Sequence, residues 1–218
     1  MNTAALRELI QHAHRHEAET GHLARRLEAQ WEGLHPAIRL PPENPHAALA
    51  AFVAAYVDEV PELLDAAAEV ALEAGIEDRI KPILKVAEQF FLQPPALMAG
   101  HEGLDGLLDE AYLAHRLVEE VNDRYIAHLG QPLIPLDTTV ANLIAHQLIG
   151  EAFANQLDEA VRHAVEGMLE ADTFAQDSVQ RYRERLSDPH TEAAWKRWPC
   201  LSRRLGVELQ LEPRVALG

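Results

Sequence analysis

Histidines and carboxylates recur in this chain at spacings of four or five residues. Of its 218 residues, 12 are histidines. Residues four apart share one face of a helix, so such pairs could meet inside a bundle. The candidate metal ligands are His12, His16, His115, Glu119, His146 and Glu151. Neutral imidazole suits iron, zinc, copper or nickel and carboxylate adds charge, so this set predicts a transition-metal centre between helices.

Three of these pairs resemble the metal-binding motifs of the haemerythrin family. His115-x-x-x-Glu119 and His146-x-x-x-x-Glu151 are similar to its His-x3-Glu and His-x4-Asp/Glu motifs, and His12-x-x-x-His16 is similar to a further histidine pair. The resemblance implies a non-haem di-iron centre that binds or senses oxygen. The chain differs from the family in the order of the motifs. It also differs in the predicted helix over residues 47–74, which has no histidine.

The same histidines fit a second interpretation. Buried polar groups in proteins are generally hydrogen-bonded, so His16, His115 and His146 could be half-buried side chains bonded to polar neighbours, with no metal. The sequence contains no motif of the other common catalytic or nucleotide-binding sites: it has no glycine-rich phosphate loop, nucleophile elbow or zinc-protease helix. Its single cysteine, Cys200, excludes an intramolecular disulfide and favours a reducing, cytoplasmic compartment.

Helices must position these side chains. Apolar residues recur at helical spacing almost throughout, and the alternation typical of strands is nearly absent, so we predict an all-α protein. Four long amphipathic helices are predicted, over residues 3–34, 47–74, 104–129 and 137–169, with a shorter one over 77–92. Pro61 is expected to kink or restart the second of them. Long amphipathic helices of similar length are typical of a helical bundle.

The bundle is predicted to occupy residues 1–172, and a basic tail residues 173–218. Within the tail we predict a short helix over 179–186, a second helix over the TEAAWKRW segment, and a strand-like alternation in VELQL. The tail is expected to pack on the bundle and not to form a second domain.

Charge is distributed unevenly along the chain. The 19 Lys and Arg against 35 Asp and Glu give a net charge of −16, which excludes a nonspecific nucleic-acid binder. Residues 43–177 hold 25 Asp and Glu but six Lys and Arg, a charge of −19, so the remainder carries +3. The longest apolar stretch, residues 47–57, is too short to span a membrane.

Six carboxylates fall on the outward face of the predicted helix over residues 47–74, and we call them the acidic ridge. They are Asp58, Glu59, Glu62, Asp65, Glu69 and Glu73. Three interpretations remain open: a solvated face that maintains solubility, an intramolecular clasp by arginines of the tail, and a docking surface for a basic protein partner.

We therefore expect a soluble cytoplasmic helical protein that binds or regulates through protein contacts. Its partner would be another protein or a second copy of the chain, since amphipathic helices often bury leftover apolar surface in dimers. No nucleic-acid or membrane partner is expected. The alternative is a haemerythrin-like protein that holds iron or another transition metal and has a redox or oxygen-related role.

Overall fold

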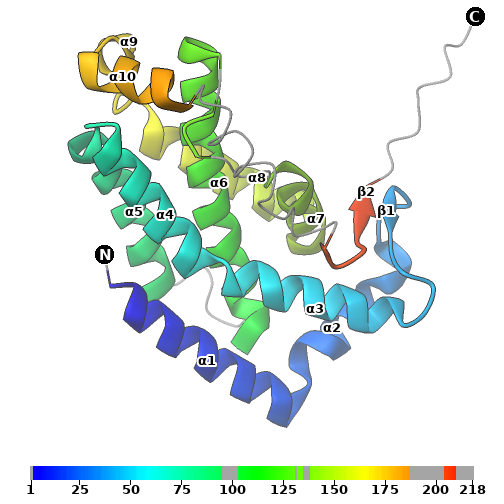
Figure 1. Ribbon diagram of the computed structural model, residues 1–218. Helices are drawn as coiled ribbons and strands as arrows, with labels where there is room; N and C mark the ends of the chain where they lie inside the picture. The colour runs from blue at the N-terminus through cyan, green and yellow to red at the C-terminus, as the bar shows by residue number, and fades with distance from the viewer. Residues whose placement is uncertain (1, 95–102, 131, 135–137, 187–203, 210–218) are drawn as a thin grey trace, which may run out of the picture.

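The computed structural model describes residues 2–94, 103–130, 132–134, 138–186 and 204–209. Helices dominate this part of the chain, which confirms the predicted all-α class (Figure 1). The elements in chain order are α1 (Thr3–Thr20), α2 (His22–Gln30), the 3-10 turn η1 (Trp31–Gly33), β1 (Ile38–Arg39), α3 (Pro45–Asp58), α4 (Val60–Glu73), α5 (Glu77–Leu92), α6 (Gly103–Leu129), α7 (Thr139–Ile149), α8 (Glu151–Val165), α9 (Ala171–Phe174), α10 (Asp177–Leu186) and β2 (Glu208–Leu209).

Helix α6 is the central element. It is 27 residues long, agrees with the predicted helix over residues 104–129, and contacts each of α1 to α5 and α7 to α9. Because other helices surround it, α6 buries polar side chains as well as apolar ones: Asp105, Asp109, Glu110, His115 and Asn122. This one helix therefore positions several of the side chains that could carry chemistry.

Two of the predicted long helices are interrupted at glycine. The helix predicted over residues 3–34 is divided into α1 and α2 because Gly21 adopts a left-handed conformation with φ of +61°. The helix predicted over residues 137–169 is divided into α7 and α8 at Gly150, where φ is +100°. Glycine adopts positive φ readily, whereas apolar periodicity continues through such a break. The prediction of unbroken helices is wrong here, and a four-helix bundle is not confirmed.

The helix predicted over residues 47–74 restarts where Pro61 lies. Helix α3 ends at Asp58 and α4 begins at Val60, with Pro61 in its first turn. Proline is tolerated there because its missing N–H would have no partner within the helix. The shorter predicted helix over residues 77–92 agrees with α5.

The tail has one confirmed helix and one confirmed strand. Helix α10 covers the predicted segment 179–186, and β2 lies within VELQL. Strand β2 pairs antiparallel with β1, so Ile38 opposes Leu209 and Arg39 opposes Glu208. No strand was predicted at Ile38 and Arg39, because a pairing this distant leaves no local pattern. The TEAAWKRW segment lies outside the described residues.

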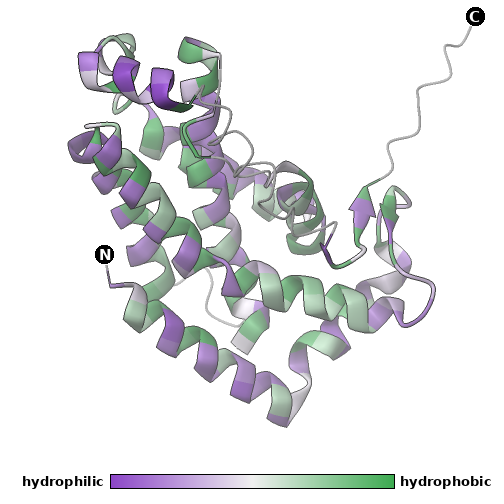
Figure 2. Ribbon diagram, viewed as in Figure 1, coloured by the Kyte–Doolittle hydropathy of each residue, from purple (hydrophilic) through white to green (hydrophobic). Residues whose placement is uncertain are grey.

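Apolar side chains from most helices form one core. Its largest fully buried members include Tyr56, Tyr112, Tyr125, Phe52 and Phe91. Figure 2 shows that α3 is apolar along most of its length, whereas α1 and α10 carry many polar residues. In the described part of the chain, no helix is long and apolar enough to cross a membrane.

Candidate functional site

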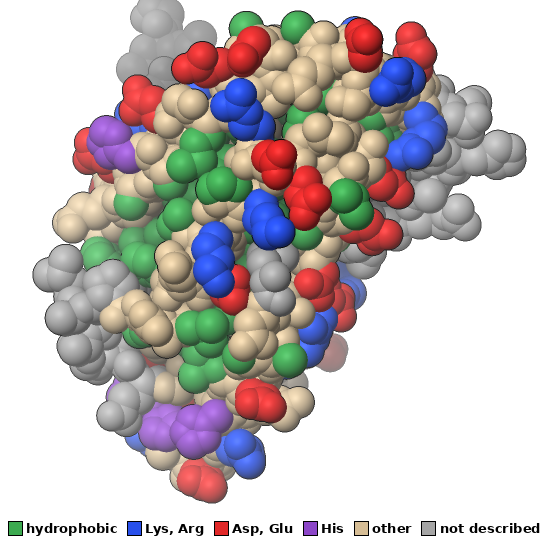
Figure 3. Space-filling model, turned by 90° about the vertical axis from the view of Figure 1, so that its left-hand side faces the viewer, with side chains coloured by type: hydrophobic (Ala, Val, Ile, Leu, Met, Phe, Trp, Pro, Cys, Tyr) green, Lys and Arg blue, Asp and Glu red, His purple; other side chains and the backbone are tan. Residues whose placement is uncertain are grey.

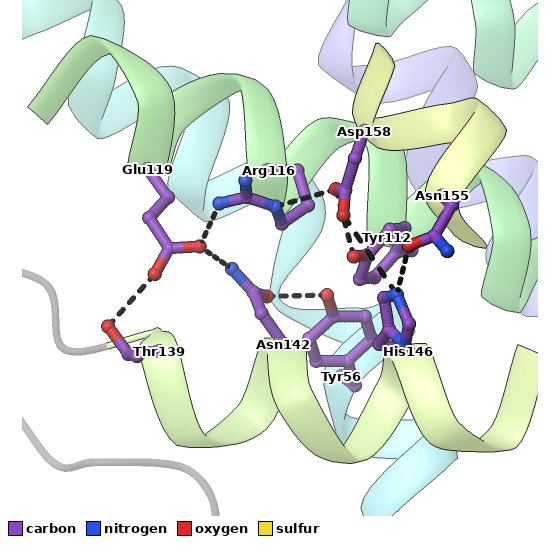
Figure 4. Close-up of polar contacts among 9 residues, drawn as sticks. All are labelled: Tyr56, Tyr112, Arg116, Glu119, Thr139, Asn142, His146, Asn155 and Asp158. Carbon is purple, nitrogen blue, oxygen red and sulfur yellow. Dashed lines mark hydrogen bonds and ion pairs between the residues drawn. The ribbon is translucent and has the colours of Figure 1, made fainter. Parts of the chain in front are cut away.

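A polar cavity of about 310 Å³ lies between α6, α7 and α8, and we call it the polar cleft (Figure 4). Its lining side chains come from three helices: Tyr112, Arg116 and Glu119 of α6, Thr139, Asn142, Leu143 and His146 of α7, and Asp158 of α8. All but Leu143 are polar. The cleft is therefore a place where hydrogen-bonding groups from three helices converge.

Helical spacing aligns the lining residues within each helix. Tyr112, Arg116 and Glu119 follow one another at intervals of four and three, so they share a face of α6. Asn142 and His146 share a face of α7 in the same way. The break at Gly150 lets α8 leave the line of α7, and His146 contacts α8 across that break, where its Nε2 donates to Asn155 Oδ1 at 3.1 Å.

Arg116 is held between two carboxylates. Its Nε donates to Asp158 Oδ1 at 2.9 Å, and its Nη1 donates to Glu119 Oε2. The Arg116 side chain is four-fifths buried. Burial alone would lower the pKa of Arg116, but the hydrogen bond to Asp158 and the charge of Glu119 outweigh that effect, so the pKa lies above its ordinary value. Arg116 therefore stays charged and joins α6 to α8.

The Tyr112 hydroxyl also binds Asp158. It donates to Oδ1 at 2.9 Å, the oxygen that accepts from Arg116. Burial, followed by the charge of Asp158, raises the pKa of Tyr112 above its usual range. The hydroxyl therefore remains a donor. The second carboxylate oxygen, Oδ2, lies 4.0 Å from His146 Nε2.

Glu119 connects the cleft to α7 and, through it, to α3. Its carboxylate accepts from Thr139 Oγ1 at 2.9 Å and from Asn142 Nδ2 at 2.5 Å, in addition to Arg116. The Asn142 Oδ1 in turn accepts from the buried Tyr56 hydroxyl at 2.7 Å. Figure 4 shows the resulting chain of contacts, which runs from Tyr56 to Asp158. Each of its side chains is oriented by at least one other, so the cleft is preorganised.

The cleft carries more negative than positive charge. Counting histidine as neutral, one guanidinium faces two carboxylates, which leaves one excess negative charge. The cleft is also partly shielded from water: Asp158 is 30 % exposed and Glu119 is 13 % exposed. Charge interactions are stronger in such an environment than in bulk water. The arrangement is suited to a ligand that donates hydrogen bonds and carries positive charge.

His115 lies in the core and not in the cleft. Its ring stacks on that of Tyr56, with centroids 4.0 Å apart, and its Nε2 donates to the Tyr56 carbonyl oxygen at 3.0 Å. That carbonyl belongs to the last turn of α3, where helical acceptors lack partners within the helix. Burial lowers the pKa of His115 to about 4. His115 is thus a neutral buried histidine bonded to a polar neighbour.

The other predicted metal ligands are scattered. His12 lines a separate apolar cavity beside Glu110. His16 lies against Gly103, where an added Cβ would come within 2.7 Å of His16 Cδ2. Glu151 is exposed at the start of α8.

Of the six predicted ligands, Glu119 and His146 line the polar cleft together. In the described part of the chain, no group of three or more His, Cys, Asp or Glu side chains could hold a metal ion. The convergence that the spacing predicted is therefore not found there, because residues on one helical face need not face the same cavity as those of the next helix.

The acidic ridge is exposed and largely paired within the chain. From α1, Arg7 lies 3.3 Å from Asp65 and His14 Nε2 lies 2.6 Å from Asp58. From the tail, Arg185 Nη2 lies 2.6 Å from Glu73 Oε2 and Arg204 Nη2 lies 3.2 Å from Glu59 Oε1. These two contacts are of the kind that the clasp interpretation predicts, and the two from α1 were not predicted.

Among the described residues, Glu62 and Glu69 have no basic partner. Charges of both signs also intermix over the face shown in Figure 3.

Several residues of the cleft were missed at the sequence level. They are Tyr112, Arg116, Thr139 and Asn142. A signal was present, since polar residues at intervals of three and four interrupt the apolar pattern of two predicted helices. That signal does not say which helix faces meet, and this information comes only from the tertiary structure.

No protein family, curated protein or solved structure matches this chain.

Proposed function

We propose that this chain is a binding protein whose polar cleft receives a small ligand with a positively charged, hydrogen-bond-donating group. The observation that carries the proposal is the excess of one carboxylate over guanidinium in a partly buried cavity. A cation would balance this charge, whereas an anionic ligand would meet both Asp158 and Glu119.

Asp158 is the natural contact for the positive group. Its Oδ1 accepts from Tyr112 and Arg116, while its Oδ2 is directed toward His146 at a distance of 4.0 Å, beyond hydrogen-bonding range. An ammonium group at Oδ2 would form a charge-assisted hydrogen bond. Leu143, which is 48 % exposed, supplies an apolar wall for the rest of the ligand.

The size of the cleft limits the ligand. A volume of about 310 Å³ is at the lower end of the range, roughly 300 to 1,000 Å³, that is usual for small-molecule sites. The oriented side chains lower the entropic cost of binding because few of them must be immobilised when the ligand enters. A short diamine or an amine with a compact polar body fits these limits.

The experiment uses 1,4-diaminobutane and succinate, which have the same four-carbon length and opposite charge. Backbone amide NMR shifts of α6, α7 and α8 are followed during titration of each compound into the full chain. We expect the diamine to produce saturable shifts around Tyr112, Asn142 and His146, and succinate to produce none. Succinate binding as tightly as the diamine would contradict the proposal.

The matched variants are Asp158→Asn and Glu159→Gln, which remove one carboxylate each from neighbouring positions of α8. Glu159 is exposed, lies outside the cleft and pairs only loosely with His163. Asp158→Asn should weaken diamine binding about ten-fold or more, the value of a lost charged hydrogen bond. Glu159→Gln should leave it unchanged.

A second candidate function is the docking of a basic protein segment on the acidic ridge. The supporting observation is that Glu62 and Glu69 are exposed, are two helical turns apart, and have no basic partner among the described residues. Leu72, which is 63 % exposed, lies on the same helix.

The test of this second function is the binding of an amphipathic lysine-rich helical peptide. The variant is Glu62→Gln/Glu69→Gln, and the charge-matched control is Glu8→Gln/Glu19→Gln of α1. Equal binding by both double variants would contradict docking at the ridge.

A further inference from the structure

A second cavity, of about 220 Å³, lies between α1, α5 and the beginning of α6. Its described walls are mainly apolar and include Leu9, Phe91 and Leu107. Two titratable side chains also line it, His12 from α1 and Glu110 from α6. We call this space the apolar pocket. It shares no described lining residue with the polar cleft.

Glu110 is a buried carboxyl, and only 4 % of the residue is exposed. Its Oε2 has no hydrogen-bond partner among the described residues. Burial, followed by the charge of Asp109, raises the pKa of Glu110 to about 8. An uncompensated buried carboxyl is costly, and such a group in a native structure calls for an explanation.

Two of the other buried carboxyls have basic partners. Asp105, five residues earlier on α6, pairs with Arg26. Glu88 of α5 pairs with Lys85 at 3.1 Å and accepts from the Asn2 backbone N–H at 2.9 Å. Glu110 differs from both because it lines a cavity and forms no ion pair with a basic side chain among the described residues. The missing partner is therefore expected to come from a molecule that occupies the apolar pocket.

We propose that the apolar pocket binds a hydrophobic primary amine, whose ammonium group pairs with the Glu110 carboxylate and whose apolar body packs between α1, α5 and α6.

The local charge favours a cation over other ligands. Asp109, which is buried next to Glu110, adds negative charge to the region. A fatty acid would bring a further carboxyl into this environment, and an alcohol would leave the carboxyl uncompensated when it ionises. His12 is exposed at the wall of the pocket and is the one basic side chain among its described lining residues. His16 of α1 packs against Gly103 at the same end of α6.

Binding at neutral pH should release a proton. Because the pKa of Glu110 is about 8, its carboxyl is largely protonated at pH 7. The amine arrives as an ammonium ion, the Glu110 proton passes to solvent, and the ammonium–carboxylate pair remains. No atom or electron is otherwise exchanged. Net release of one proton is a signature that purely apolar binding would not produce.

The volume sets the size of the amine. An apolar cavity of about 150 Å³ accepts benzene, so a pocket of about 220 Å³ accommodates a molecule somewhat larger. Hexylamine is a suitable probe. Its matched neutral analogue is 1-hexanol, which has the same chain length but lacks the charge.

The test is calorimetric titration of the full chain at pH 7 with each probe, in two buffers of different ionisation enthalpy. We expect hexylamine to bind at one site with net proton release, and 1-hexanol to bind about ten-fold or more weakly without it. Glu110→Gln should weaken hexylamine binding by a similar factor and abolish the proton release, while 1-hexanol binding should be unchanged.

Three controls identify the site. Glu8→Gln removes an exposed carboxylate of α1 beside Leu9 and should have no effect. Leu9→Trp should weaken both probes because it fills the pocket without altering Glu110. Glu159→Gln removes an exposed carboxylate of α8 that lines neither cavity, and it should leave hexylamine binding unchanged. Equal affinity of the two probes, no binding of hexylamine, or undiminished binding by Glu110→Gln would each overturn the proposal.

Discussion

Arg116 and Asp158 join α6 to α8 through a hydrogen bond of 2.9 Å between Nε and Oδ1. The two residues are 42 positions apart in the chain, and both side chains are largely shielded from water. Glu119 and Tyr112 complete the contacts around them. The same groups that hold three helices together thus form the walls of the polar cleft, so stability and ligand binding depend on one network.

Removal of Arg116 should destabilise the fold. Arg116→Met leaves Asp158 and Glu119 without their shared cation, and the loss of one partner of a buried pair costs about 3 kcal/mol. The free energy of unfolding in urea measures this. Arg124→Met is the control, because Arg124 pairs with Glu120 on the same helix and lies closer to the surface. Its expected cost is below about 1 kcal/mol, and equal losses in the two variants would contradict the role assigned to Arg116.

His115 should make the protein less stable in acid. Its pKa in the folded state is about 4, below the value of 6.5 for an unperturbed histidine. The unfolded chain therefore binds the proton more tightly, and stability falls as the pH is lowered from about 6.5 toward 4.

His115→Gln tests this dependence, since an amide can still donate to the Tyr56 carbonyl oxygen but does not titrate. The variant should lose roughly 2 kcal/mol less stability than the wild type between pH 6.5 and 4.5. His163→Gln is the control, because His163 is about two-thirds exposed. Identical acid dependence in the wild type and in His115→Gln would show that His115 is not the group responsible.

Glu110 should have the opposite effect. Its pKa is raised from 4.5 to about 8 in the folded state, so the folded state binds the proton more tightly. Its contribution to stability is unchanged below about pH 4.5, declines as the pH rises toward 8, and stays low above it. Glu110→Gln should therefore be more stable than the wild type at pH 9, by an amount that disappears near pH 4.5. Thermal unfolding at the two pH values measures the difference, and a variant less stable than the wild type at pH 9 would contradict this assignment.

Gly150 should be required for the break between α7 and α8. Its φ of +100° is unfavourable for any residue with a Cβ, although an added Cβ would meet no atom within 4 Å. Gly150→Ala should thus cost about 1 kcal/mol or more through backbone strain alone. Gly33 also has open space around its Cα but lacks positive φ, so Gly33→Ala is the control and should be neutral or stabilising.

The helices could be predicted from the sequence because each buries an apolar face, and the central helix over residues 104–129 was placed within one residue of its start. The divisions at Gly21 and Gly150 could not, since the apolar pattern continues across them. Periodicity reports which residues share a face and not where the backbone turns.

The site was harder to predict than the fold. His115 was expected to be either a metal ligand or a half-buried side chain bonded to a polar neighbour, and spacing could not distinguish a ligand from a donor to the Tyr56 carbonyl. The partners of the acidic ridge lie far away in sequence: His14 is 44 residues from Asp58, and Arg204 is 145 residues from Glu59. The apolar pocket likewise exists because three helices leave space beside Glu110. These features are products of tertiary contacts.

Titration of 1,4-diaminobutane into the wild-type chain and into Asp158→Asn, followed by amide shifts in α6, α7 and α8, tests directly whether the polar cleft binds a cation. We expect saturable binding to the wild type, centred on the polar cleft, and binding about ten-fold or more weaker in the variant. Equal affinity in the two proteins, or shifts confined to residues outside the cleft, would contradict it.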